Sequence, residues 1–393
     1  MSRIARSLLA AGVFAPVLAL APVEVASAAS SSPMVLVVDT GSSCPSHEAF
    51  LPLSGTVVAN ISWGDGTSSS DRAGAGAKHR YRTPGRYTVK VSGTMSWLGG
   101  QGAVDSCIVS VQQWGQTTLQ ALDGAFYGDT SLQSVPDNLP ASVVNLDFAF
   151  SETRFNQPLA GWDTSHVTSM HEMFDHDTAF NQPIGSWNTA KVVDMGNMFT
   201  FDSSFNQPLG AWNTSHVTTM GGMFTFDSSF NQPLGAWNTS SVIDTSSMFS
   251  GDSAFNQPLG AWNTSHVTTM GGMFAGAGAF NQPLGAWDTS KVQSMAGMFW
   301  GAAHFNQPLG AWNLGSIHAK AKVGLIPALT RMLEASGMSS ANYGATLAGW
   351  ASRTEPQGLA FGATGIKYPS TAASARAKLT GTYHWRITDG GRA

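Results

Sequence analysis

The feature that most constrains this chain is a repeat of constant length. Without any insertion, the tetrapeptide Phe-Asn-Gln-Pro recurs every 25 residues, starting at Phe155, Phe180, Phe205, Phe230, Phe255, Phe280 and Phe305. Segments 205–224 and 255–274 are identical. A fixed period of this size is the signature of a stacked array in which each unit contacts only its neighbours. We therefore expect seven solenoid repeats over residues 155–313.

The residues that every copy keeps separate the inside of the stack from its outside. Large apolar residues occupy fixed offsets, in one copy Phe205, Leu209, Trp212, Val217, Met220, Met223 and Phe224. One repeat cannot bury so many side chains alone, so stacking must join them into a continuous core. The invariant asparagines, such as Asn206, are expected to form a ladder, because stacked chains lie about 4.8 Å apart. Val-Thr-x-Met favours one short strand per repeat.

The repeat also carries a family resemblance. The pattern Phe-Asn-Gln-Pro-Leu-x-x-Trp-Asp/Asn-Thr-Ser-x-Val-x-x-Met-x-x-Met-Phe resembles the bacterial surface-protein repeat, which is related to BspA-like leucine-rich repeats, over residues 120–393. The resemblance implies a leucine-rich-repeat-like solenoid with short parallel strands. It also implies a secreted or cell-surface protein that binds or adheres to other molecules, such as an extracellular or host protein.

The first 29 residues are typical of an export signal. Arg3 and Arg6 supply positive charge, residues 8–20 form a short apolar run, and 26–28 match a small-x-small cleavage site. The alternative of a membrane anchor is weak because the run is short. No later stretch is apolar for long enough to span a bilayer, so we expect no membrane span after signal removal.

Flanking modules are expected on both sides of the repeats. Residues 33–112 contain alternating strand-like runs and an Asp-Gly turn, which resemble a PKD-like β-sandwich. Residues 119–154 form a degenerate entry repeat that serves as an N-terminal cap, and residues 314–393 form a small α/β cap with helix-like apolar spacing at 325–335 and 340–351. After export, Cys44 and Cys107 are expected to form a disulfide, the alternative being two buried thiols.

Charge is unevenly distributed along the chain. Residues 155–313 hold ten carboxylates and two lysines, whereas residues 314–393 hold nine Lys and Arg residues and three carboxylates. An acidic centre would be repelled by phosphate, so nucleic acid is excluded as a partner. No Ser or Thr is singled out by a neighbouring His and carboxylate, so we predict a non-enzymatic protein without a cofactor.

Two polar columns are candidate sites. His166, His216 and His266 share one position of the repeat but lie two repeats apart, too far to share a metal ion, so they are expected to face solvent. The second column consists of Asp177, Asp202, Asp227 and Asp252. These carboxylates are expected to cap nearby backbone N–H groups, and bound Ca²⁺ is the alternative.

Positions that vary between copies indicate where a partner would bind. Phe201 and Phe226 would stack side by side, with Trp300 further along. Exposed aromatic residues among polar ones are typical binding anchors, although these rings could also fold back onto the repeats as packing. We expect a protein partner, and as the alternative a glycan that stacks on these rings.

Overall fold

The computed structural model describes residues 32–41, 47–100, 107–318 and 327–393. The expected export signal and Cys44 lie outside these residues. Cys107 is disulfide-bonded. No helix within the described ranges is long and apolar enough to cross a bilayer.

The N-terminal module consists of two antiparallel sheets. One sheet has the strand order β4-β3-β6-β1-β7, and β2 pairs with β5 in the other. The strands are β1 (Met34–Asp39), β2 (Glu48–Leu51), β3 (Leu53–Ser62), β4 (Ser68–Asp71), β5 (Ala77–Arg80), β6 (Arg86–Leu98) and β7 (Ile108–Gln113). Alternate residues of β3, such as Val57, Ala59 and Ile61, are buried, as a strand with one solvated face requires.

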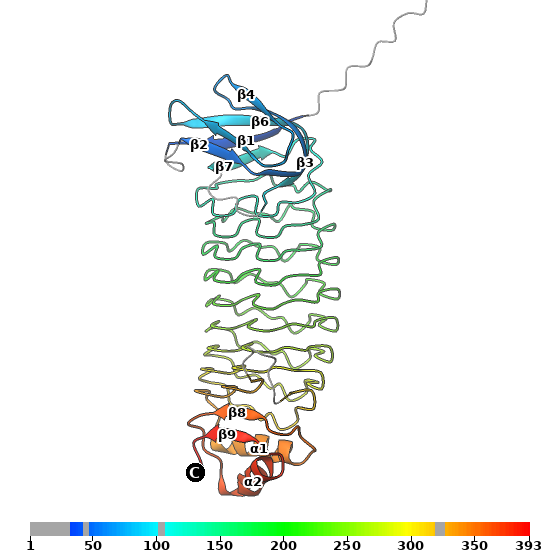
Figure 1. The fold of residues 1–393 in the computed structure, drawn as a ribbon, viewed down its shortest axis with the longest axis vertical. Helices are drawn as coiled ribbons and strands as arrows, with labels where there is room; N and C mark the ends of the chain where they lie inside the picture. Colours follow the sequence, from blue (N-terminus) through cyan, green and yellow to red (C-terminus); the bar gives the residue numbers. More distant parts are fainter. Residues whose placement is uncertain (1–31, 42–46, 101–106, 319–326) are drawn as a thin grey trace, which may run out of the picture. The chain divides into compact units, whose positions relative to one another are not determined.

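The structure corrects the expected fold class. A leucine-rich-repeat-like solenoid with short parallel strands is wrong, because most strands of the described residues are antiparallel and lie in the N-terminal sheets. Within residues 155–313, all of which the structure describes, no strand forms and the repeats do not close into a solenoid. Figure 1 shows the repeats as stacked turns of chain without strand arrows. Neighbouring repeats meet through isolated parallel bridges, such as Ser169↔Asp194, Asp194↔Thr219, Thr219↔Asp244 and Asp244↔Thr269.

Turns on both sides of the expected strand residues leave a single bridge there, because Val167 N–H donates to Thr164 O before the segment and Met173 N–H donates to Met170 O after it. Left-handed residues then turn the chain further along each repeat. Glu172 has φ 52° and His176 has φ 57°, and the equivalent residues of other repeats also have positive φ. Such residues turn the chain and interrupt an extended run. The backbone is nevertheless paired between repeats, because the N–H groups of Glu172 and Phe174 donate to Gly196 O and Met198 O, each at 2.9 Å.

Aromatic columns form the core of the repeats. Phe174 stacks on Phe199 with ring centroids 5.7 Å apart, and Phe199 stacks on Phe224 at 5.6 Å. Each repeat adds a buried tryptophan whose indole N–H donates backwards, as Trp212 Nε1 does to Ile184 O at 3.1 Å. Each tryptophan of this column therefore buries its ring and satisfies its polar atom in the same contact.

The predicted asparagine ladder is present, but its bonds differ from the expected amide-to-amide contacts. Asn206 Oδ1 accepts the backbone N–H of Asn231 at 3.1 Å and the side-chain amide of Gln232 at 2.9 Å. The same pair of bonds recurs from Asn156 to Asn306. One side-chain oxygen thus holds two donors of the next repeat.

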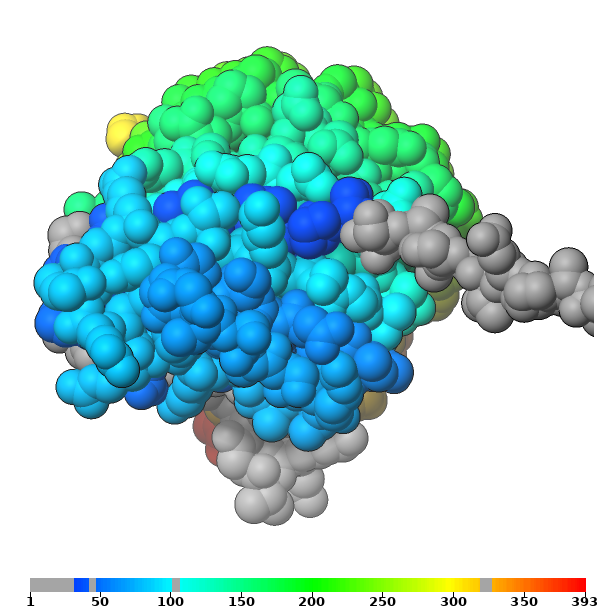
Figure 2. Space-filling view, turned by 90° about the horizontal axis from the view of Figure 1, so that it is seen from above, coloured from blue at the N-terminus to red at the C-terminus, as the bar shows by residue number. Residues whose placement is uncertain are grey.

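Both ends of the repeats are covered. At the N-terminal end, Leu98 N–H of β6 donates to Ala121 O, and in Figure 2 the atoms of this module, in blue, lie in front of the repeats, in green. The C-terminal segment contains α1 (Ser340–Ala351), β8 (Ala360–Ala363), η1 (Ser370–Ala372), α2 (Ala373–Gly381) and β9 (Arg386–Asp389), with β8 and β9 parallel. The first turn of α1 continues the ladder, because Ser339 N–H and Asn342 Nδ2 both donate to Asn306 Oδ1.

We predict that Asn231→Ala lowers the free energy of unfolding by about 1–3 kcal/mol. The substitution removes the acceptor for Asn256 N–H and Gln257 Nε2, each 3.0 Å from Asn231 Oδ1. Chemical denaturation followed by circular dichroism measures the change.

Asn238→Ala is the matched control. Asn238 is exposed, and its Oδ1 accepts only Ser240 N–H of its own repeat among the bonds of the described residues. Its loss should cost about 0.5 kcal/mol or less. Equal losses in the two variants would contradict a stabilising role for the ladder.

Candidate functional site

One side of the repeats carries the residues that differ most between copies. We call it the variable face and define it as the side chains that are not buried in residues 121–128, 145–152, 169–176, 194–201, 219–226, 244–251, 269–276 and 294–301. Each segment begins at a bridge residue and ends at a left-handed residue. Side chains at one position therefore lie next to their counterparts in the neighbouring repeats.

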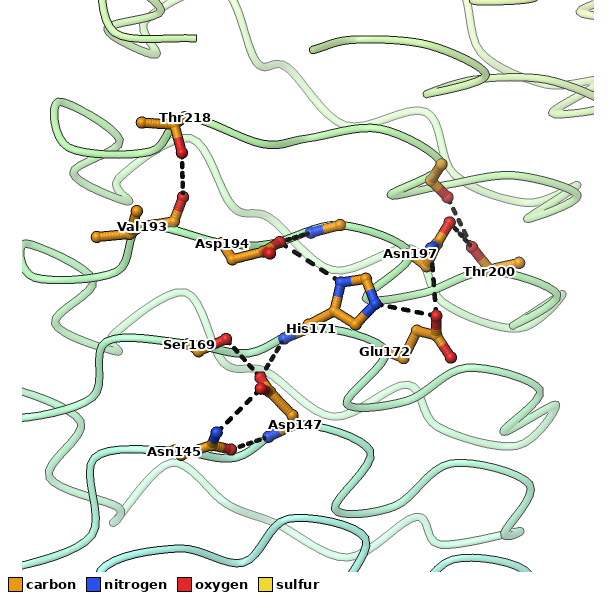
Figure 3. Close-up of polar contacts among 12 residues, drawn as sticks. Asn145, Asp147, Ser169, His171, Glu172, Val193, Asp194, Asn197, Thr200 and Thr218 are labelled. Carbon is orange, nitrogen blue, oxygen red and sulfur yellow. Dashed lines mark hydrogen bonds and ion pairs between the residues drawn. The ribbon is translucent and has the colours of Figure 1, made fainter. Parts of the chain in front are cut away.

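A polar cluster centred on His171 occupies the N-terminal part of this face (Figure 3). His171 Nε2 lies 3.0 Å from Glu172 Oε1, and its Nδ1 lies 3.5 Å from Asp194 Oδ1. The Asp194 carboxylate, more than Glu172, raises the pKa of His171 above its ordinary value, although burial opposes the shift. The imidazole is therefore stabilised in its charged form between two carboxylates.

The backbone of His171 is held from the preceding repeat. Its N–H donates to Asp147 Oδ1 at 2.8 Å, and Ser169 Oγ donates to the same oxygen. Asn145 Nδ2 donates to the second oxygen, Asp147 Oδ2, at 3.0 Å. The cluster thus spans three repeats, from Asn145 to Asp194.

A shallow hollow of about 400 Å³ continues the face beyond this cluster. It is lined by His171, Gly196, Asn197, Thr219, Gly221, Gly222, Thr225, Asp244, Ser246 and Ser247. The hollow exists because glycine replaces a larger side chain at neighbouring positions, as at Gly196 and Gly221. Its polar lining presents hydrogen-bonding groups to anything that covers it.

The variable face is acidic, and the basic residues in its sequence segments are the histidines His171 and His176. Its carboxylates are Asp123, Asp147, Glu152, Glu172, Asp175, Asp194 and Asp244, and none of the eight segments contains Lys or Arg. Six of the seven lie in the first four segments. The charge is therefore concentrated at the N-terminal part of the face.

An aromatic ridge, defined as His176, Phe201 and Phe226, crosses the same face. The ring centroids of His176 and Phe201 are 4.4 Å apart, and those of Phe201 and Phe226 are 4.8 Å apart. Phe201 is 39% exposed and Phe226 is 49% exposed. The two Phe rings stack side by side as predicted, and they form a ridge on the surface that does not fold into the core.

The backbone of the ridge is left-handed at each residue. The φ angles of His176, Phe201 and Phe226 are 57°, 59° and 56°. The following repeats have Gly251 and Gly276 at this position, with φ 74° and 70°. Glycine adopts this conformation without steric cost, whereas a bulky residue does not. The ridge therefore places large rings where the backbone favours glycine.

The other predicted binding residues lie apart from the ridge. Trp300 is 49% exposed and belongs to the position before the ridge column, three repeats beyond Phe226. His166, His216 and His266 are exposed, and each ring nitrogen Nδ1 lies within 3.4 Å of the preceding serine hydroxyl. The structure does not bring these residues together with the ridge.

The aspartate column lies inside the repeats. Asp177, Asp202, Asp227 and Asp252 are fully buried. Each caps a turn, as Asp227 Oδ1 does for Ser229 N–H at 3.3 Å and Asp177 Oδ1 for Ala179 N–H at 3.1 Å. The second oxygen of Asp202, Asp227 and Asp252 has no hydrogen-bond partner.

Burial controls the protonation of this column. It raises the pKa of Asp177 to about 6 and that of Asp252 to about 8. Burial and the neighbouring Asp252 raise the pKa of Asp227 to about 9, and burial with Asp227 and Asp177 raises that of Asp202 to about 10. Three of the four side chains are therefore neutral at pH 7, which avoids repulsion between stacked carboxylates.

For the calcium alternative, the described residues hold no group of three or more His, Cys, Asp or Glu side chains placed to bind a metal ion.

The His171 cluster and the hollow were not predicted from the sequence. The repeat draws attention to residues that all copies share, whereas His171 and Glu172 each occur in one copy only. The concentration of charge in the first four segments was the available signal.

Residues 144–252 and 225–323 match a repeat family described as Mycoplasma protein of unknown function, DUF285. The match covers the repeats and leaves the N-terminal sheets and most of the C-terminal segment outside. No curated protein and no solved structure matches the chain.

We predict that Asp227→Asn stabilises the protein relative to the parent as pH rises. An Asp whose pKa is about 9 in the folded state and 3.8 in the unfolded state is ionised when unfolded at pH values between the two, so it must bind a proton on folding. The stability that it contributes is complete below about pH 4 and falls as pH rises towards the folded pKa. Because Asn cannot ionise, the difference should grow by on the order of 1 kcal/mol per pH unit between about pH 5 and 8.

Urea denaturation at a series of pH values measures this difference. Asp163→Asn is the control, because Asp163 is exposed and its pKa is lowered by Ser165. That variant should show no gain with rising pH. A difference between Asp227→Asn and the parent that stays constant with pH would contradict the protonated column.

Proposed function

We propose that this chain is a secreted or cell-surface binding protein, which holds a protein partner on the variable face and performs no chemistry on it. The observation that carries the proposal is the aromatic ridge at left-handed backbone positions. The resemblance of the repeats to bacterial surface-protein repeats of the BspA-like kind, and of the N-terminal module to PKD-like domains, supports the same function.

The ridge residues occupy a backbone conformation that disfavours them. A bulky residue in the left-handed region costs about 1–3 kcal/mol, whereas stacking between neighbouring rings returns only about 0.5–1.5 kcal/mol per pair. Repeats with Gly251 or Gly276 at this position stack through the same backbone bonds, since Gly251 N–H donates to Ala275 O as Phe226 N–H does to Ser250 O. Bulky residues in strained backbone conformations are typical of functional sites.

The geometry of the rings favours a protein partner over a glycan. A sugar stacks on the face of an aromatic ring. Both faces of Phe201 are covered, one by His176 and the other by Phe226. The outer face of Phe226 lies against Gly251, where an added β-carbon would be 2.3 Å from the ring. The ring edges remain exposed beside polar and acidic groups, which suits insertion into a pocket of another protein.

The test is binding of the purified chain to immobilised fibronectin, fibrinogen, laminin, collagen and the chain itself, measured by surface plasmon resonance. We expect saturable binding to at least one of these proteins. Phe201→Gly with Phe226→Gly should weaken that binding at least tenfold, because it removes both rings and leaves the residue that the backbone prefers.

Val193→Thr with Ile243→Thr is the matched control. These residues are also exposed and apolar, and the intervening repeats carry Thr218 and Thr268 at the same position. The control should bind like the parent. Binding to a glycan array that the Gly variant loses would favour the carbohydrate alternative, and absence of binding to every probe would refute the proposal.

A further inference from the structure

We propose that the partner of the aromatic ridge is a second copy of this chain, bound in an antiparallel pair with twofold symmetry. The inference rests on the proposed function, because it assigns the partner of the same ridge. Three observations support it. They are the order of large and small residues along one column of left-handed residues, a hollow at the C-terminal end of that column, and opposite charges at the two ends of the variable face.

The column that contains the ridge changes from large to small residues along the chain. It reads Gly128, Glu152, His176, Phe201, Phe226, Gly251, Gly276, Gly301 and Ala335, all with positive φ. Ala335 continues the column because Gly301 N–H donates to Glu334 O in the same way as Phe226 N–H donates to Ser250 O. The column therefore protrudes from Glu152 to Phe226, whose ring also covers Gly251, and it leaves room from Gly276 to Ala335 beside the exposed Trp300.

A hollow of about 530 Å³ follows directly after Ala335. It is lined by residues 335–338, Ser340 and residues 364–367. Met338 and Ile366 give it apolar walls, and Lys367 is exposed at its edge. It therefore offers a recess of mixed polar and apolar lining, with a cation beside it, at the C-terminal end of the same column.

A twofold axis through Gly251 would bring the protruding part of each column against the open part of the other, so each contact occurs twice. It places Phe226 of one copy opposite Gly276 of the other, and Phe201 opposite Gly301. In the same register, His176 lies opposite Ala335, and Glu152 meets the edge of the hollow near Lys367. From His176 to Phe226 each large residue then faces a small one, and the same surface serves both copies.

Charge selects the antiparallel orientation. The N-terminal end of the face carries Glu152, Glu172 and Asp175, with no Lys or Arg in its segments. The C-terminal end carries Lys367 and Arg331, which are both exposed, although Arg331 also lies 3.7 Å from Glu334. A parallel pair would place acid against acid, whereas the antiparallel pair places each acidic end against a basic one. Such a contact is closed, so it yields a dimer and no larger assembly.

Sedimentation equilibrium of the purified chain tests the inference. We expect a reversible dimer that weakens as salt concentration rises, because charge pairs contribute to it. Glu152→Lys and Lys367→Glu should each weaken dimerisation at least tenfold, since each places like charges together twice. The double variant Glu152→Lys with Lys367→Glu should recover most of the parent affinity, which loss of folding could not produce.

The ridge variants complete the experiment. Phe201→Gly with Phe226→Gly should abolish the dimer, and the control Val193→Thr with Ile243→Thr should dimerise like the parent. A dimer that is indifferent to the ridge and charge variants, or one that the double charge swap fails to restore, would overturn the inference. A monomer whose ridge binds a matrix protein would overturn the inference and leave the proposed function intact, whereas a monomer that binds no probe would refute both.

Discussion

The backbone hydrogen bonds between successive repeats set the conditions for every other feature of this protein. Glu172 and Phe174 donate to the repeat that follows, and their counterparts do the same along the array. An insertion within the bonded segments would shift these donors against their acceptors, whereas a longer connection between segments keeps them in register, as Gly301 N–H donating to Glu334 O shows. The same bonds place each side chain on its counterpart. A substitution in one repeat therefore changes the surface at a fixed position along the stack.

The core and the ladder follow from the sequence, whereas the backbone path does not. The period, the buried Phe and Trp columns, the asparagine ladder and the helix at 340–351 were all anticipated because each depends on a repeated residue type. The parallel strands were expected wrongly. Left-handed φ values at Glu172 and His176 turn the chain there, and neither residue type signals such a conformation as glycine does.

The candidate site was predictable only in part. Comparing copies identified Phe201 and Phe226, because variation against a constant background marks positions that the fold does not fix. Their left-handed backbone and the covered ring faces required the structure. The His171 cluster was missed since its members come from three successive segments and none recurs. The aspartate column, in contrast, recurs because it caps turns inside the repeats.

The last rung of the asparagine ladder has a consequence for assembly. A stack of identical units ends in unpaired donors and acceptors that would fit the first unit of another chain, and such edges promote fibre growth. Here the amide oxygen of Asn306 is taken by Ser339 and Asn342, and Ala121 is paired with β6 at the other end. Chains sealed in this way cannot join end to end. They can only meet side by side, so association leaves the length of the array unchanged.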